Sequence, residues 1–252
     1  MTNRIIVFLG PSLDQNEAPR ILDAIYQPPA AQGDVVRAVM SLKADCIVLI
    51  DGVFATAPAV RHKEILWALD RGVHVYGASS MGALRAAELH AYGMEGHGLI
   101  YRWYRAIPLA DDDEVAVAMM PAELGSQALS DALIDIRLTL RRAERSRIIS
   151  SAMRRRLEAT ARDLHFIDRT YTALFDKARR LLPKDEEAVI HLLETWVDEH
   201  AVRQKREDAI SLLHHVASRR FTRAPVETAP FRMTEAWAND LDAAGLFSEN
   251  IL

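Results

Sequence analysis

Two adjacent serines are the residues of this chain best suited to covalent chemistry. The stretch Ala78-Ser79-Ser80-Met81-Gly82 matches the nucleophile-elbow pattern G-x-S-x-G, except that alanine replaces the first glycine. In that pattern a sharp strand-to-helix turn presents the middle serine, here Ser80, for attack on a carbonyl carbon. The backbone N–H groups of Met81 and Gly82 would begin the helix, where they could stabilise a negative substrate oxygen. The competing interpretation makes Ser79 or Ser80 a simple helix N-cap.

The elements that must position this turn form an alternating pattern of strands and helices. Apolar runs at Arg4–Leu9, Cys46–Ile50 and Val73–Tyr76 have the length and β-branched content of buried strands. Helical spacing of apolar residues follows the last two runs. We therefore predict an α/β fold with a parallel sheet and covering helices in the N-terminal half, followed by a mainly helical C-terminal region.

Ligands of parallel sheets bind beyond the carboxyl ends of the strands, so polar residues at these ends are further candidates. Ser12 follows the first run and either caps the next segment or faces the site. Asp51 ends the second run and either forms an Asx-turn, orients a lysine or binds a cation. Arg85 lies three residues before Glu88, so the two could pair across one helical turn; the alternative is that Arg85 faces an anionic substrate.

The composition changes from about Pro121 onward, where glycine becomes rare and long helical patterns begin. We therefore divide the chain into an α/β core over 1–110 and a mainly helical region over 111–252. Nine arginines but only two acidic residues lie between Arg137 and Arg162, which indicates either a solvated helix face or a docking surface for an acidic protein or peptide. Residues 186–216 read as one helix. Thr234–Ala244 predicts a short terminal helix, capped by Thr234, that packs on the core or on a partner.

The overall composition excludes several classes of protein. The net charge is −4, and no nucleic-acid-binding motif is present, so we do not expect a nucleic acid partner. No run approaches about 18 apolar residues, so we expect no membrane span and a cytoplasmic protein. The acidic run Ala110–Glu114 is expected to be mostly solvated, and we predict no metal site and no cofactor.

Longer motifs within residues 4–105 resemble the TfuA-like protein family. They are Phe8–Leu13, Asp51–Phe54, Pro58–Leu66, Gly77–Leu89 and Tyr92–Met94. TfuA-like proteins accompany YcaO enzymes, which convert peptide backbone amides to thioamides in ribosomally made peptides. The resemblance implies that this chain hydrolyses a thiocarboxylated, ubiquitin-fold sulfur-carrier protein of the ThiS type and so releases sulfide for a YcaO partner.

The same resemblance implies roles for individual residues. Ser80 is then the nucleophile, and Lys63, which without the family would be read as a solvated helix residue, is its base. The oxyanion- and substrate-binding candidates are Met81, Gly82, Ser79, Ser12, Asp51, His62 and Arg85. The alternative function is a non-catalytic adaptor that recruits YcaO, the precursor peptide or the sulfur carrier. A nucleotide-binding protein is disfavoured because neither glycine-rich phosphate motif is present.

Overall fold

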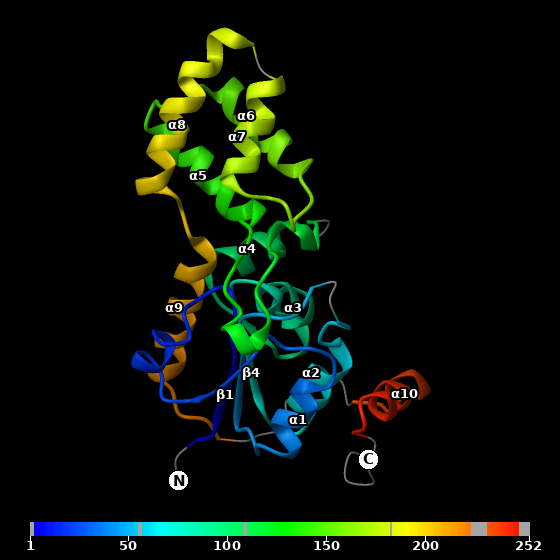
Figure 1. Ribbon diagram of the computed structural model, residues 1–252. Coiled ribbons are helices and arrows are strands. Elements are labelled where there is room, and N and C mark those ends of the chain that lie inside the picture. The colour runs from blue at the N-terminus through cyan, green and yellow to red at the C-terminus, as the bar shows by residue number, and fades with distance from the viewer. Residues whose placement is uncertain (1–2, 55–56, 108–109, 182, 223–230, 247–252) are drawn as a thin grey trace. The chain divides into compact units, whose positions relative to one another are not determined.

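The computed structural model describes residues 3–54, 57–107, 110–181, 183–222 and 231–246, which form two compact units. The first unit comprises residues 1–109, 121–126 and 205–252, and the second comprises 110–120 and 127–204. The chain thus leaves the first unit close to the predicted boundary at residue 110. It also returns to that unit, so the last 48 residues belong with the α/β core rather than with the helical region. Figure 1 shows the elements of both units.

The first unit contains a five-stranded parallel sheet, which confirms the predicted fold class. Its strands are β1 (Ile5–Phe8), β2 (Ile25–Gln27), β3 (Cys46–Leu49), β4 (His74–Gly77) and β5 (Glu95–Gly96), in the order β2-β1-β3-β4-β5. Phe8 pairs with Leu49, which in turn pairs with Gly77, so β1, β3 and β4 end at the same level. Strand β5 was not predicted, because its two residues lie in a stretch rich in glycine.

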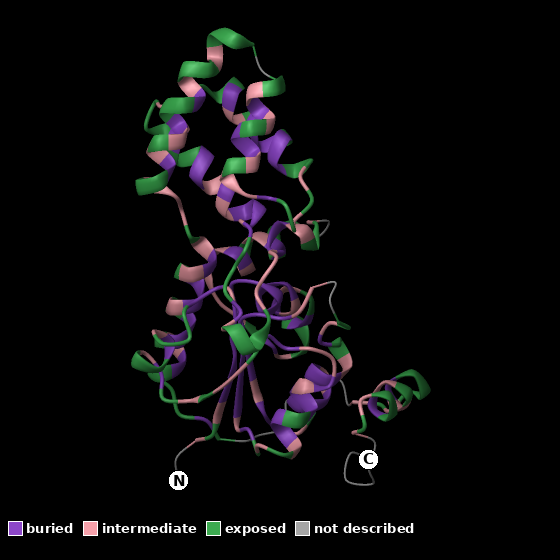
Figure 2. Cartoon of the chain, viewed as in Figure 1, coloured by how far each residue is buried: buried purple, intermediate pink, exposed green. Residues whose placement is uncertain are grey.

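Helices cover both faces of this sheet. Alternate strand residues such as Val7, Val48 and Tyr76 pack in one apolar cluster with Leu212 and Leu213 of α9 (Gln204–Ala217). The intervening residues are equally buried and point to the opposite face. That face carries α1 (Asp34–Met40), α2 (His62–Asp70) and α3 (Met81–Leu89), as Figure 1 shows. The strands are therefore covered on both sides, which explains their nearly continuous apolar sequences (Figure 2).

The remaining helices of the first unit lie at later points in the chain. Helix α4 (Gly98–Ala106) follows β5, and α10 (Glu235–Ala243) is the predicted terminal helix. The Thr234 hydroxyl accepts a hydrogen bond from the Trp237 N–H at 3.3 Å, which confirms the predicted cap. Helix α10 packs on the first unit, where Arg37 of α1 donates to the Ala244 carbonyl oxygen at 3.1 Å. Residues 223–230, which precede it in the chain, lie outside the described residues.

The second unit is helical, as predicted for the C-terminal region. Its main helices are α5 (Leu133–Arg145), α6 (Ser151–Arg162), α7 (Tyr171–Leu181) and α8 (Glu187–His200), which share an apolar core of their own. The prediction of one helix over 186–216 was wrong, because the chain breaks between α8 and α9. Side chains of α5 stabilise the break: the Val202 N–H donates to the Thr139 hydroxyl and the Gln204 N–H to Asp135, both at 2.9 Å.

No helix in the part of the chain that the structure describes is long and apolar enough to cross a membrane.

Candidate functional site

Glycines allow α3 to begin directly against the ends of the strands. A Cβ atom on Gly82 would lie 1.7 Å from the Leu49 carbonyl oxygen, and one on Gly77 would lie 2.1 Å from the Gly82 carbonyl oxygen. No side chain fits in either place. The Gly82 N–H also donates to the Ile50 carbonyl oxygen at 3.2 Å. The glycines of this motif therefore fix the serine turn at the carboxyl edge of the sheet.

The sharp turn itself is centred on Ser79. Its φ angle is +68°, a left-handed value that is uncommon for a residue with a Cβ atom. The Ser80 N–H donates to the Ala78 carbonyl oxygen at 2.8 Å, which closes a γ-turn around Ser79. The sequence pattern centred the turn on Ser80. In the structure Ser80 is instead the N-cap residue of α3, with φ −117°, and its hydroxyl makes no capping hydrogen bond.

A chain of hydrogen bonds connects Ser79 to two other predicted site residues. The Ser79 hydroxyl donates to the Ser12 hydroxyl at 2.8 Å, and the Ser12 hydroxyl donates to Asp51 Oδ1 at 2.6 Å. The other carboxylate oxygen, Oδ2, accepts from the backbone N–H groups of Gly10 and Ser12 at 2.9 and 3.1 Å. All three side chains are buried: Ser79 and Asp51 are 0% exposed and Ser12 is 5% exposed.

The three hydrogen-bonded residues Ser12, Asp51 and Ser79 lie where the strand order of the sheet reverses. Ser12 follows β1 and Asp51 follows β3. The strand after β1 is added on one side of this adjacent pair, and the strands after β3 are added on the other side. Ligands of open parallel sheets bind at such a reversal. The structure therefore brings Ser12, Asp51, Ser79 and Ser80 together at the part of the fold best suited to binding.

The two predicted oxyanion donors differ in their availability. The Gly82 N–H is already bonded to the Ile50 carbonyl oxygen. The Met81 N–H has no acceptor among the described residues. It stands at the first position of α3, where the helix leaves its donors unpaired and the helix dipole favours negative charge. Of the two predicted donors, Met81 is thus the one that remains able to bind an oxyanion.

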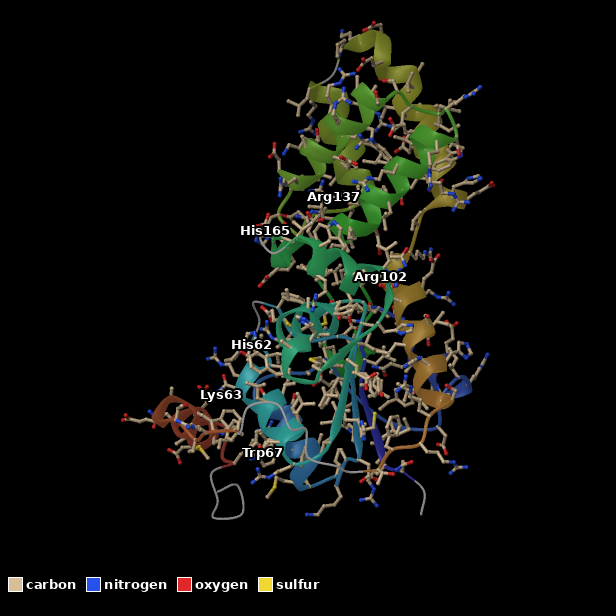
Figure 3. All side chains as sticks on the ribbon, turned by 180° about the vertical axis from the view of Figure 1, so that it is seen from behind. His62, Lys63, Trp67, Arg102, Arg137 and His165 are labelled. Carbon is tan, nitrogen blue, oxygen red and sulfur yellow. The ribbon has the colours of Figure 1, made fainter. Side chains whose placement is uncertain are left out.

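Lys63 lies apart from the serines in this structure. Its ammonium group donates to the Arg232 carbonyl oxygen at 3.3 Å and lies 5.2 Å from the centre of the Phe231 ring. Both groups belong to the segment that leads into α10. Figure 3 shows Lys63 on the side of α2 nearest that helix. Among the interactions of the described residues, none joins Lys63 to Ser79 or Ser80.

His62 and Arg85 form a separate cluster around Glu88. His62 Nε2 lies 2.8 Å from the Glu88 carboxylate, Arg85 donates to it at 2.7 Å, and Arg85 Nε donates to the Val60 carbonyl oxygen at 3.1 Å. Burial alone would raise the pKa of Glu88, but the hydrogen bond from His62 and the charge of Arg85 outweigh it and lower that pKa. The predicted pairing of Arg85 with Glu88 is confirmed.

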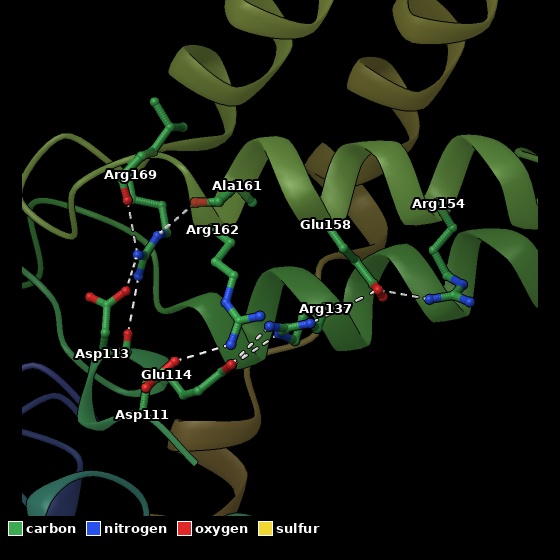
Figure 4. Close-up of polar contacts among 10 residues, drawn as sticks. Asp111, Asp113, Glu114, Arg137, Arg154, Glu158, Ala161, Arg162 and Arg169 are labelled. Carbon is green, nitrogen blue, oxygen red and sulfur yellow. Dashed lines mark hydrogen bonds and ion pairs between the residues drawn. The ribbon is translucent and has the colours of Figure 1, made fainter. Parts of the chain in front are cut away.

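The acidic run and the arginine-rich helices of the second unit pair with each other (Figure 4). Glu114 is 2% exposed and accepts two hydrogen bonds from Arg137, at 2.9 and 3.0 Å. Arg162 pairs with Asp111 at 3.0 Å. The expectation that the acidic run is mostly solvated was therefore wrong at Glu114, because Arg137 of α5 pairs with this buried carboxylate. The described residues contain no group of His, Cys, Asp or Glu side chains that could hold a metal ion.

Arg169 is a structural residue that sequence analysis did not identify. Its side chain is fully buried and donates to the carbonyl oxygens of Leu164, Ala161 and Asp113 at 2.9, 3.1 and 3.1 Å, and to the Asp113 carboxylate. These contacts tie the acidic run to the end of α6. No local pattern in the sequence marks this arginine as buried.

Fold and site together define a doubly wound α/β protein with a buried serine turn at the reversal point of its sheet. The family model of TfuA-like proteins matches residues 51–170. That stretch belongs to the TfuA-like family, and the match includes Asp51, Lys63 and the Ser79–Ser80 turn. The match continues into the second unit, well beyond Met94, where the quoted motifs end, and it begins after Phe8–Leu13. A comparison with curated proteins found no match.

Proposed function

We propose that this protein is an accessory enzyme of peptide backbone thioamidation, which hydrolyses a thiocarboxylated sulfur-carrier protein and releases sulfide for a YcaO partner. The observation that carries the proposal is the strained serine turn of a TfuA-like chain, beside a buried carboxylate and the Met81 N–H, which has no acceptor among the described residues. A serine in that setting has the parts that acyl transfer needs: a nucleophile, a proton acceptor and an oxyanion donor.

The reaction begins when a serine oxygen attacks the carbonyl carbon of the thiocarboxylate. A tetrahedral intermediate forms, its C–S bond breaks, and the sulfur leaves as hydrosulfide with the proton that the serine gave up. Water then hydrolyses the acyl-serine to a carboxylate and regenerates the hydroxyl. The thiocarboxylate is already negative, so attack requires donors such as the Met81 N–H to stabilise the additional charge.

The predicted base, Lys63, must change its surroundings to take part. A base must lie within hydrogen-bond reach of the hydroxyl that it deprotonates, whereas Lys63 Nζ contacts a carbonyl oxygen and a phenyl ring of another segment. The contacts with Arg232 and Phe231 would therefore have to break before Lys63 could accept a proton. The assignment of Ser80 and Lys63 as the catalytic pair stays a prediction.

The burial of both serines favours a flexible substrate. Ser79 is 0% and Ser80 2% exposed, so the segments that cover the turn must part before a substrate reaches either hydroxyl. The extended carboxyl-terminal tail of a carrier protein is narrow enough to enter such an opening, whereas a folded surface is not. This shape requirement favours a carrier tail over bulkier acyl groups.

The adaptor function is supported by a different observation. Arg141, Arg145 and Arg155 are exposed, and no ion pair of theirs occurs within the described part of the chain. Charges of this kind steer and orient an acidic partner. An adaptor would use them to hold YcaO, the peptide or the carrier without chemistry of its own.

Sulfide release from a purified thiocarboxylated carrier, in the absence of YcaO, separates the two functions. The hydrolase predicts release by the wild-type protein and loss of release in the double variant Ser79→Ala/Ser80→Ala. Ser151→Ala serves as the control, because this exposed hydroxyl lies outside the serine turn and its loss should leave catalysis intact. Wild-type protein that binds YcaO but releases no sulfide would support the adaptor.

A further inference from the structure

The hydrogen-bond chain at the sheet reversal distinguishes between the two adjacent serines. We propose that Ser79 is the nucleophile and that Ser12, oriented by Asp51, takes its proton. This inference rests on the proposed hydrolase function. It replaces neither the family assignment nor the reaction, but names which hydroxyl reacts and where its proton goes.

The single hydrogen of each hydroxyl fixes the direction of this chain. An ionised carboxylate can only accept, so the Ser12 hydrogen must lie on the 2.6 Å contact with Asp51 Oδ1. Ser12 then has no hydrogen left for Ser79 and must be the acceptor in the 2.8 Å contact between the two hydroxyls. The Ser79 hydrogen is therefore directed at Ser12, and the remaining lone pairs of its oxygen are free to attack.

Backbone N–H groups fix the position of the Asp51 carboxylate. Two backbone N–H groups donate to its Oδ2 atom, which leaves Oδ1 to the Ser12 hydroxyl. Hydrogen bonds to a carboxylate are strong, and a dry site strengthens them further, because little water competes. Asp51 is thus a positioning residue: it polarises Ser12, which touches the reacting oxygen of Ser79.

The backbone at Ser79 supports the same assignment. A positive φ costs a residue with a Cβ atom about 1 kcal/mol or more, and glycine would remove that cost. The strained position nevertheless carries a serine whose hydroxyl lies in the chain to Asp51. Ser80, at φ −117° and ψ −126°, makes no capping hydrogen bond, and no hydrogen bond joins it to Ser12 or Asp51 among the described residues. Its hydroxyl therefore has no proton acceptor among the described residues.

The proton transfers of this mechanism balance. As Ser79 Oγ bonds to the carbonyl carbon, its proton moves to Ser12 Oγ while the Ser12 proton moves to Asp51. When the C–S bond breaks, the same path returns a proton to the departing sulfur, which leaves as hydrosulfide. In the second half, water adds its oxygen to the acyl carbon and gives one proton along the path. That proton returns to Ser79 Oγ as the ester bond breaks, and the other leaves with the product carboxylic acid, which ionises.

A fluorophosphonate probe tests the assignment without any carrier protein. The serine oxygen that attacks phosphorus displaces fluoride and keeps the phosphonyl group. Trypsin would release residues 72–85 as one peptide, because no lysine or arginine lies between Arg71 and Arg85. Fragment-ion masses then place the adduct on Ser79 or Ser80. We expect it on Ser79, lost in Ser79→Ala and retained in Ser80→Ala.

The role of Ser12 is tested by a matched pair of variants. Ser12→Ala removes the acceptor and should slow labelling and sulfide release about 100-fold or more. Ser12→Thr keeps a hydroxyl and should recover most of the rate, which a merely structural role for Ser12 would not require. Circular dichroism and melting temperatures equal to wild type would show that the fold is intact.

The possible results separate the inference from the proposed function. An adduct on Ser80, or sulfide release that survives Ser79→Ala, would overturn the inference and leave the hydrolase in place. Labelling of Ser79 without sulfide release from the carrier would support the inference and overturn the proposed substrate. No adduct and no sulfide release by the wild-type protein would overturn both.

Discussion

Replacing Gly82 by alanine tests the packing that positions the serine turn. Helix propensity alone predicts that Gly82→Ala stabilises the protein by about 0.5–1 kcal/mol, because alanine is the better helix former. The structure predicts the opposite sign. The new Cβ atom would lie 1.7 Å from the Leu49 carbonyl oxygen, whereas such a contact needs roughly 3.2 Å, so the start of α3 must move about 1.5 Å away from β3.

The expected cost follows from that displacement. Overpacking by flexible side chains costs about 1–3 kcal/mol, and a backbone carbonyl cannot rotate away as a side chain can. We therefore expect Gly82→Ala to lower the free energy of unfolding by about 3 kcal/mol or more, measured by urea denaturation with circular dichroism. The shift also moves Ser79 away from Ser12, so fluorophosphonate labelling should fall with it.

Gly125→Ala is the matched control, because a Cβ atom there meets nothing within 4 Å although φ is +91°. Gly125→Ala should lower the free energy of unfolding by only about 1 kcal/mol, which is the cost of the left-handed backbone alone. A Gly82→Ala protein as stable as wild type would refute the claim that α3 begins in contact with the Leu49 carbonyl group.

Three further predictions concern other parts of the chain. Burial raises the pKa of Glu64 from 4.5 to about 7 and outweighs the opposing hydrogen bonds from backbone N–H groups. The protonated carboxyl group therefore contributes its full stabilisation below pH 4.5. About 3 kcal/mol of that stabilisation is lost as the pH rises from 4.5 through 7. Glu64→Gln should flatten this dependence, seen as a smaller difference in urea midpoint between pH 5 and pH 8 than in wild type. Arg169→Met leaves buried carbonyl groups unpaired and should cost about 3–5 kcal/mol, measured as earlier urea unfolding of the second unit; an unchanged midpoint would contradict its structural role. Trp237→Ala should lower the stability of α10 by about 3 kcal/mol, measured as hydrogen exchange of its amides that is about 100-fold faster. Trp237→Phe should lower that stability much less, because the buried indole N–H has no partner within the described residues.

Strands β1, β3 and β4 and the terminal helix could be predicted because their signals are local. The apolar run Cys46–Ile50 became β3 over Cys46–Leu49, and Thr234 caps α10 as its position suggested. The break before α9 could not be predicted, since no glycine or proline marks it and its acceptors, Thr139 and Asp135, come from another helix.

The site was predictable residue by residue but not as an arrangement. The strand-end rule selected Ser12, Asp51 and the serine turn, yet Ser12 lies 39 residues from Asp51 and 67 from Ser79. Spacing cannot show that their oxygens meet, nor that the sharp turn is centred on Ser79 rather than Ser80. Lys63 failed to join the serines because its contacts are with the segment before α10, about 170 residues away in the chain.

The first unit is built from stretches that are far apart in the sequence, and this affects the protein during its synthesis. The apolar cluster that covers Val7, Val48 and Tyr76 is completed by α9, which follows β1 by about 200 residues. At about 5–20 residues per second, a ribosome needs roughly 10–40 s to reach α9 after making β1. Throughout that interval the nascent sheet exposes one apolar face, and the helical unit, which ends at residue 204, is complete only as α9 begins. We expect chaperones that bind nascent chains to engage the α/β unit during this interval, and release to coincide with the emergence of α9.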